Sequence, residues 1–180
     1  MQVARLSSVS ILIAVMLVAV ALPACADDAC KGFKWDVSKE RALYSARAVL
    51  RAAGKDATSA AVVTPNRLYR LRLNAQDEVA LGESGTQKLS MGRAYAGMAT
   101  LEIDAPGRYR VSVDTPLWID VLAHGKLVPV TDFAGSHDCN APRKIVEFEL
   151  AARESFLVQV SGSDRISIRL TVTPSPVRKL

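Results

Sequence analysis

The stretch RISIRLTV, from Arg165 to Val172, alternates polar and apolar side chains without a break. In a β-strand, successive side chains point to opposite faces, so this stretch predicts a strand with one apolar and one wet face. The same two-residue period occurs in LYRLRL (68–73), RYRVSV (108–113) and VEFEL (146–150). The sequence therefore predicts a mainly β protein built from antiparallel sheets.

Shorter segments complete the expected set of strands, at 78–81, 88–91, 98–103, 117–122, 126–130 and 155–160. Turn residues such as Pro106-Gly107 and His124-Gly125 separate several of them. Eight or more short strands with such turns predict an antiparallel β-sandwich of jelly-roll-like order.

One segment before the strands has a helical pattern. Between Asp36 and Gly54, apolar residues such as Leu43 and Leu50 recur at helical spacing, and Gly54 offers a stop. We expect a short N-terminal helix here, followed by a surface linker over 54–64. The predicted organisation is a signal peptide (1–26), a helix and linker segment (27–66), a sandwich (67–174) that packs with it as one domain, and a frayed tail (175–180).

The N-terminus predicts export. Ile11 to Leu22 is an unbroken apolar run, too short to span a bilayer but long enough for a signal-peptide core. Ala24-Cys25-Ala26 follows, so we expect cleavage after Ala26 and a periplasmic or secreted protein without a transmembrane helix. Leu22-Pro23-Ala24-Cys25 also resembles a bacterial lipobox, which leaves a lipid anchor at Cys25 as the alternative.

Two cysteines remain after cleavage, and an even pair in an oxidising compartment usually forms a disulfide. We therefore expect a bond between Cys30 and Cys139. The chain-entropy model gives a loop of this length about 4–5 kcal/mol of stabilisation.

The charge of the chain is modest. The full sequence carries a net charge of +5, and the part after residue 26 has 22 Lys and Arg against 18 Asp and Glu. The basic residues are scattered, and no nucleic-acid motif accompanies them, so we expect no nucleic-acid partner. Glycine-rich phosphate loops and a nucleophile motif are absent from the sequence, and no cofactor is predicted.

Two places in the chain are candidates for ligand binding. Trp118 and Asp120 should share the face of their strand opposite Ile119 and could form a stacking platform with a polar anchor, unless Trp118 is covered by the helix or by Trp35.

The second place is the polar stretch that leads into Cys139 and the strand after it. Asp132, His137 and Arg143 lie there, in a predicted loop that the disulfide would hold. The same loop could equally be a structural corner.

Catalysis is not the favoured prediction. A jelly-roll enzyme with a metal held by two histidines would need both His124 and His137, which are far apart in the sequence for such a motif. We expect a non-catalytic envelope protein that binds a ligand, a glycan or a partner protein. A metal-dependent cupin-like enzyme and a structural lipoprotein are the alternatives.

The sequence also resembles a family of small exported bacterial proteins of unassigned function. The residues that carry the resemblance are WDVS (35–38), GRYR (107–110), WIDV (118–121) and CNAPRKIVEFEL (139–150). The resemblance implies a common fold and assigns no functional residue. The strand pattern is more loosely similar to the pre-peptidase C-terminal β-sandwich, a non-catalytic module of secreted enzymes.

Overall fold

The computed structural model describes residues 30–82, 94–139, 141–151 and 154–176. The predicted signal peptide, Cys25 and the strand expected at 88–91 lie outside these ranges.

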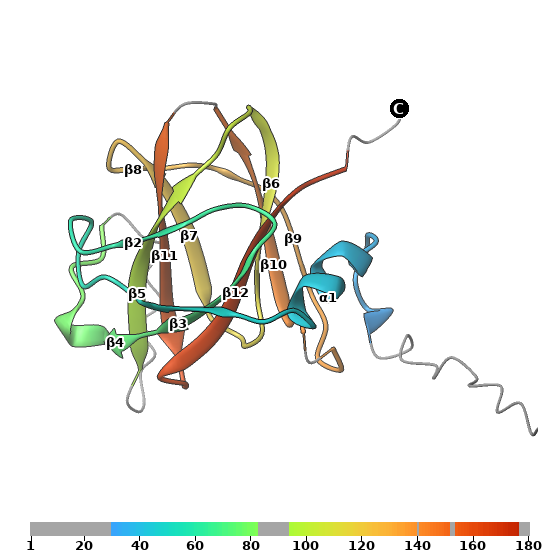
Figure 1. The fold of residues 1–180 in the computed structure, drawn as a ribbon, viewed down its shortest axis with the longest axis horizontal. Helices are drawn as coiled ribbons and strands as arrows, with labels where there is room; N and C mark the ends of the chain where they lie inside the picture. The colour runs from blue at the N-terminus through green and yellow to red at the C-terminus, as the bar shows by residue number, and fades with distance from the viewer. Residues whose placement is uncertain (1–29, 83–93, 140, 152–153, 177–180) are drawn as a thin grey trace, which may run out of the picture.

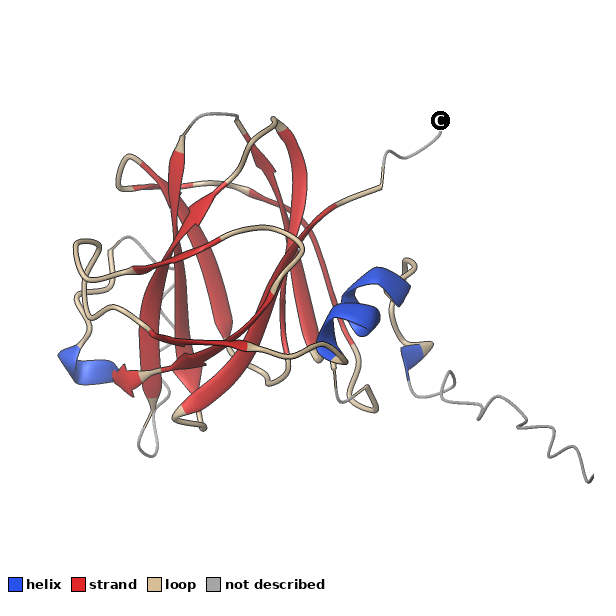
Figure 2. Ribbon diagram, viewed as in Figure 1, coloured by secondary structure: helices blue, strands red, loops and turns tan. Residues whose placement is uncertain are grey.

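Two mixed sheets pack face to face as a β-sandwich, with one short helix beside them (Figures 1 and 2). Sheet A has the strand order β1-β3-β12-β6-β10-β9, with bounds β1 Val49–Ala52, β3 Leu68–Arg72, β12 Ser167–Pro174, β6 Gly107–Val113, β10 Lys144–Leu150 and β9 Val130–Gly135. Sheet B has the order β2-β5-β11-β7-β8, with bounds β2 Ala61–Val63, β5 Tyr95–Glu102, β11 Ser155–Ser163, β7 Trp118–Ala123 and β8 Lys126–Leu127. The short β4 (Asn74–Ala75) pairs with β5. The mainly antiparallel sandwich is thus confirmed, and among the described strands only the pairs β1–β3 and β2–β5 are parallel.

The core lies between the sheets and is made by the alternating apolar positions that the sequence singles out. Leu71, Phe148 and Leu170, from three strands of sheet A, are at most 1% exposed. Ile166 is the exception in its stretch: it precedes β12 and is 49% exposed. In β12 the buried apolar residues are Ile168, Leu170 and Val172, so the apolar face begins at Ile168 and not at Ile166.

The helix is shorter than predicted. α1 spans Ser38–Tyr44, and the backbone turns out of the helix at Ser45. Val49 and Leu50, which fit a helical pattern, lie instead in β1, which pairs with β3. The strand buries part of Val49 against the core and leaves Leu50 68% exposed. Pairing with a neighbouring strand therefore overrides the local helical spacing.

Other local predictions also differ from the structure. The expected surface linker over 54–64 contains β2, whose Val63 is fully buried. The strand expected at 78–81 is replaced by a 3-10 turn over Gln76–Glu78. The polar loop expected from Asp132 onward begins as β9, because this segment pairs with β10.

α1 contacts β12 and lies against the outer face of sheet A, next to the disulfide-linked N-terminal segment (Figure 1). The sequence predicts that this face is exposed to solvent, but the part of it beneath α1 and the N-terminal segment is buried. Arg110 is 5% exposed, Glu147 is fully buried and Glu40 of α1 is 2% exposed.

Arg110 is the centre of this buried polar cluster. Its Nε donates to Glu147 Oε2 at 3.3 Å, and its Nη1 donates to the Asp36 carbonyl at 3.1 Å. The guanidinium carbon also lies 4.6 Å from the centre of the Trp35 ring. Glu40 accepts a hydrogen bond of 2.6 Å from Thr173 Oγ1. The cluster thus fixes the N-terminal segment onto sheet A by buried charges as well as apolar contacts.

The predicted disulfide is present. Cys30 and Cys139 are joined, with their Cα atoms 4.6 Å apart, and Cys139 packs with Phe33, Val37 and Ile145 in a small apolar cluster. A disulfide of this kind indicates an oxidising, extracytoplasmic environment. Among the described residues, no helix has the length and apolar character needed to cross a bilayer.

Candidate functional site

β7 presents Trp118 and Asp120 on the outer face of sheet B. The alternate residues Ile119 and Val121 are buried in the core, as the strand period requires. Trp118 is 36% exposed and Asp120 is half-buried. Neither α1 nor Trp35 covers Trp118, because both lie on sheet A. The indole therefore stays partly exposed.

Lys144 completes this group, and sequence reasoning did not find it. It is the first residue of β10 in sheet A, and its Nζ donates to the Leu117 carbonyl at 2.8 Å. The same nitrogen lies 4.7 Å from the centre of the Trp118 ring, a cation–π contact. Only the packing of one sheet on the other brings Lys144 to β7.

The two charged groups of this site shift in opposite directions, and burial is the main cause in both. Burial raises the pKa of the Asp120 carboxyl above 3.8, and the Lys144 charge partly opposes that rise. Burial lowers the pKa of the Lys144 ammonium below 10.5, and the Asp120 charge partly opposes that fall. Desolvation therefore costs each group more than their mutual attraction returns.

The Asp120 carboxylate lacks a hydrogen-bond donor within the part of the chain that the structure describes. A half-buried carboxylate without donors is costly and is typical of groups that bind water or a ligand. Asp120 thus offers a free acceptor beside an exposed indole and a partly desolvated ammonium.

A cavity of about 250 Å³ adjoins Lys144. Pro116 and Phe133 form apolar walls, and His137 and Arg143 lie at the same cavity. Phe133 is 66% exposed at the rim, and Lys34 Nζ lies 5.7 Å from the centre of its ring, a cation–π contact. Because Lys144 contacts both the cavity and Trp118, the cavity and the Trp118–Asp120 pair form one candidate site.

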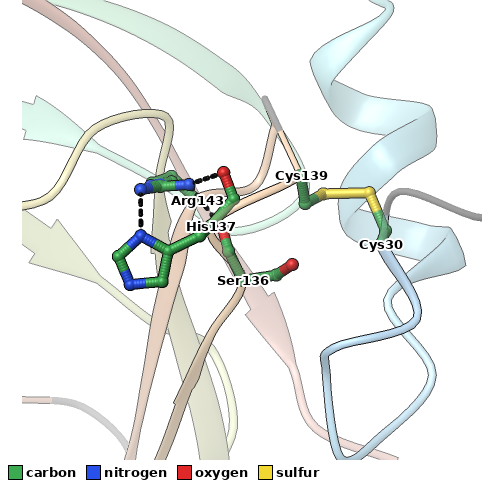
Figure 3. The surroundings of a disulfide bond; sticks show 5 residues. All are labelled: Cys30, Ser136, His137, Cys139 and Arg143. Carbon is green, nitrogen blue, oxygen red and sulfur yellow. Dashed lines mark hydrogen bonds between the residues drawn. A yellow bond between two sulfur atoms is a disulfide. The ribbon is translucent and has the colours of Figure 1, made fainter.

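Arg143 and His137 are bound to each other and to their own loop (Figure 3). Arg143 Nη2 lies 2.8 Å from His137 Nδ1, and Nη1 donates to the carbonyls of Ser136, at 2.9 Å, and His137. A guanidinium only donates, so His137 Nδ1 is the acceptor in this pair. Arg143 therefore positions the imidazole and the loop beside the disulfide.

Asp132 does not join this site. It forms an ion pair with Lys34 of the N-terminal segment, on the outer side of sheet A. Asp132 and Phe133 are neighbours on β9, so their side chains point to opposite faces of that strand. The residues that the sequence grouped therefore divide: Trp118, Asp120, His137 and Arg143 lie at the candidate site, and Asp132 does not.

The two histidines have separate surroundings. His124 lies in the β7–β8 turn at a φ of 51°, with its Nε2 3.8 Å from Glu154. His137 is held by Arg143. No group of three or more His, Cys, Asp or Glu residues suited to a metal ion occurs within the described ranges. The hypothesis of a metal-dependent enzyme therefore stays a prediction, and no observation on the described residues supports it.

No protein-family model matches the chain, and no curated protein or solved structure was found to be similar to it. The fold is a β-sandwich with one disulfide, and the candidate site lies where β7 of sheet B meets the start of β10 of sheet A. The resemblance to small exported bacterial proteins stays a prediction.

Proposed function

We propose that the protein is an exported, non-catalytic binding module that holds a glycan at the site of Trp118, Asp120 and Lys144. The observation that carries the proposal is the Asp120 carboxylate, half-buried and without a donor in the described chain, beside an exposed indole. Export is supported by the disulfide and by the N-terminal signal in the sequence.

The chemistry of a sugar fits the three side chains. A pyranose ring has an apolar C–H face that can pack on the indole, and hydroxyl groups around its rim. One hydroxyl would donate to Asp120, and another would accept from Lys144, whose ammonium has three donors. The adjoining cavity, with the Phe133 ring at its rim, has room for part of a second sugar unit.

The proposal is tested by calorimetric titration of the disulfide-bonded protein with cellohexaose, chitohexaose and maltohexaose. We expect at least one of them to bind, and Trp118→Ala and Asp120→Asn each to weaken that binding by about tenfold or more. Asp104→Asn, an exposed carboxylate in a turn away from β7, is the matched control and should bind as the wild type does.

The same titration has a pH dependence with a defined sign. Because the pKa of Asp120 is raised, its carboxylate is protonated at a higher pH than an ordinary aspartate as the pH falls. Affinity should therefore be constant near neutrality and should begin to fall, as the pH is lowered, at a pH above the ordinary aspartate value of 3.8. Absence of binding by all three oligosaccharides at millimolar concentration, or full binding by Trp118→Ala, would refute the glycan site.

A further inference from the structure

The outer face of sheet A carries a second concave surface, on a different sheet from the Trp118–Asp120 pair of β7. A groove of about 650 Å³ crosses β1, β3 and the start of β12, on the part of the sheet beyond α1. Its lining combines three arginines with two large exposed apolar side chains; these are Arg51, Arg70, Arg72, Leu50 and Ile166. We call this surface the arginine groove.

The strand register places these residues together. Arg70 and Arg72 are two positions apart on β3, so both point outward, about 7 Å apart along the strand. Leu50 of β1 is the register partner of Arg70, and Ser167 of β12 is the partner of Arg72. The floor of the groove is thus the outer face of three adjacent strands.

The positive charge of the groove is not neutralised by the described chain. Arg70 and Arg72 form no ion pair and no side-chain hydrogen bond there, and Arg51 donates only to the Leu50 carbonyl, at 3.0 Å. The next cation on the face, Arg169, is paired with Asp114 at 2.8 Å. Two unpaired like charges on one strand face oppose folding slightly, and they attract an anion.

Apolar side chains border these charges. Leu50 is 68% exposed and Ile166 is 49% exposed, although the apolar Val49 and Ile168 near them in the chain are partly or fully buried. A small hydrophilic anion would leave these two side chains in water, and a neutral hydrocarbon would leave the arginines unpaired. A ligand that combines an anionic head with a hydrocarbon part uses the whole groove.

We propose that the arginine groove binds a single anionic phospholipid molecule. A phosphate has the charge and the oxygen geometry that two guanidinium groups recognise, so it would lie between Arg70 and Arg72. The acyl part would lie against Leu50 and Ile166. The volume of the groove is in the range of sites for ligands of that size.

The test uses dihexanoyl phosphatidylglycerol below its micelle concentration, titrated into the disulfide-bonded protein by calorimetry. We expect saturable binding, with Arg70→Gln and Arg72→Gln each weakening it by about fivefold or more, and a further loss at high salt. Leu50→Ser should also weaken it. Lys126→Gln, which removes one exposed charge on β8 of sheet B, is the matched control and should change nothing.

Three comparison ligands can overturn the proposal. Equal affinity for glycerol 3-phosphate would show that the hydrocarbon part is not bound. Tighter binding of an acidic octapeptide would assign the groove to a peptide. Binding to phosphatidylglycerol vesicles without binding to the monomeric lipid would assign it to a membrane surface. Urea unfolding of the arginine variants, which should match the wild type, shows that any loss is not due to misfolding.

Discussion

At the scale of single residues, the same kind of side chain has opposite surroundings on the two halves of one sheet face. Arg72 points outward from β3 and is exposed, whereas Arg110 points outward from β6 and is 5% exposed. The difference arises because α1 and the N-terminal segment cover only the β6 side of sheet A. Arg110 therefore lies among buried carboxylates, and Arg72 lies in an open groove.

This contrast predicts the effect of removing each charge. Arg110→Met should lower the free energy of unfolding by about 3–5 kcal/mol, because Glu40 and Glu147 would then be buried without their shared cation. Arg72→Met, the same substitution at an exposed position, should stay within about 0.5 kcal/mol of the wild type. Urea denaturation measures both. Equal stability of the two variants would mean that the cluster under α1 is open to water.

At the scale of elements, the end of β1 connects the two sheets. The chain passes from sheet A through Gly54, which exchanges two backbone hydrogen bonds with Met98 of β5, at 2.8 and 3.0 Å. The approach is close because Gly97 has no side chain: a Cβ there would lie 2.4 Å from the Ala53 Cβ. The pair of small residues sets the distance between β1 and β5.

Gly97→Ala should therefore destabilise the sandwich by about 1–3 kcal/mol through overpacking. Ala53→Gly in the same chain removes the methyl group that the new Cβ would meet, and the next contact, Leu73 Cδ2 at 3.3 Å, can adjust by rotation. The double variant should therefore recover a large part of the loss. Thermal or urea unfolding of the single and double variants measures this coupling, and strictly additive effects would contradict the proposed contact.

At the scale of the whole molecule, the disulfide joins the start of the described chain to the edge of sheet A. The bonded cysteines are 109 residues apart, so the link closes most of the sandwich into one loop. It also holds the segment from Cys30 to Val37 over the Arg110 cluster, and it lies beside the His137 loop (Figure 3).

Replacing both cysteines with alanine should lower the free energy of unfolding by about 4 kcal/mol, chiefly by enlarging the unfolded ensemble. The urea m-value should rise, because a chain without the cross-link exposes more surface when it unfolds. The wild type measured under the same oxidising conditions is the reference. A loss below about 1 kcal/mol would show that the N-terminal segment is held by its other contacts alone.

The sandwich, most of its core-facing positions and the disulfide could be predicted from the amino-acid order, because a two-residue period and an even pair of cysteines are visible in short stretches or by counting. The two-residue period also placed Trp118 and Asp120 on one face. The helical spacing wrongly assigned β1 to the helix. The buried cluster around Arg110 and the position of Lys144 beside Trp118 were not predicted. Those features depend on which strands become neighbours and which face α1 covers. They became visible in the folded chain alone, because the burial and pairing of a polar side chain depend on residues distant in the sequence.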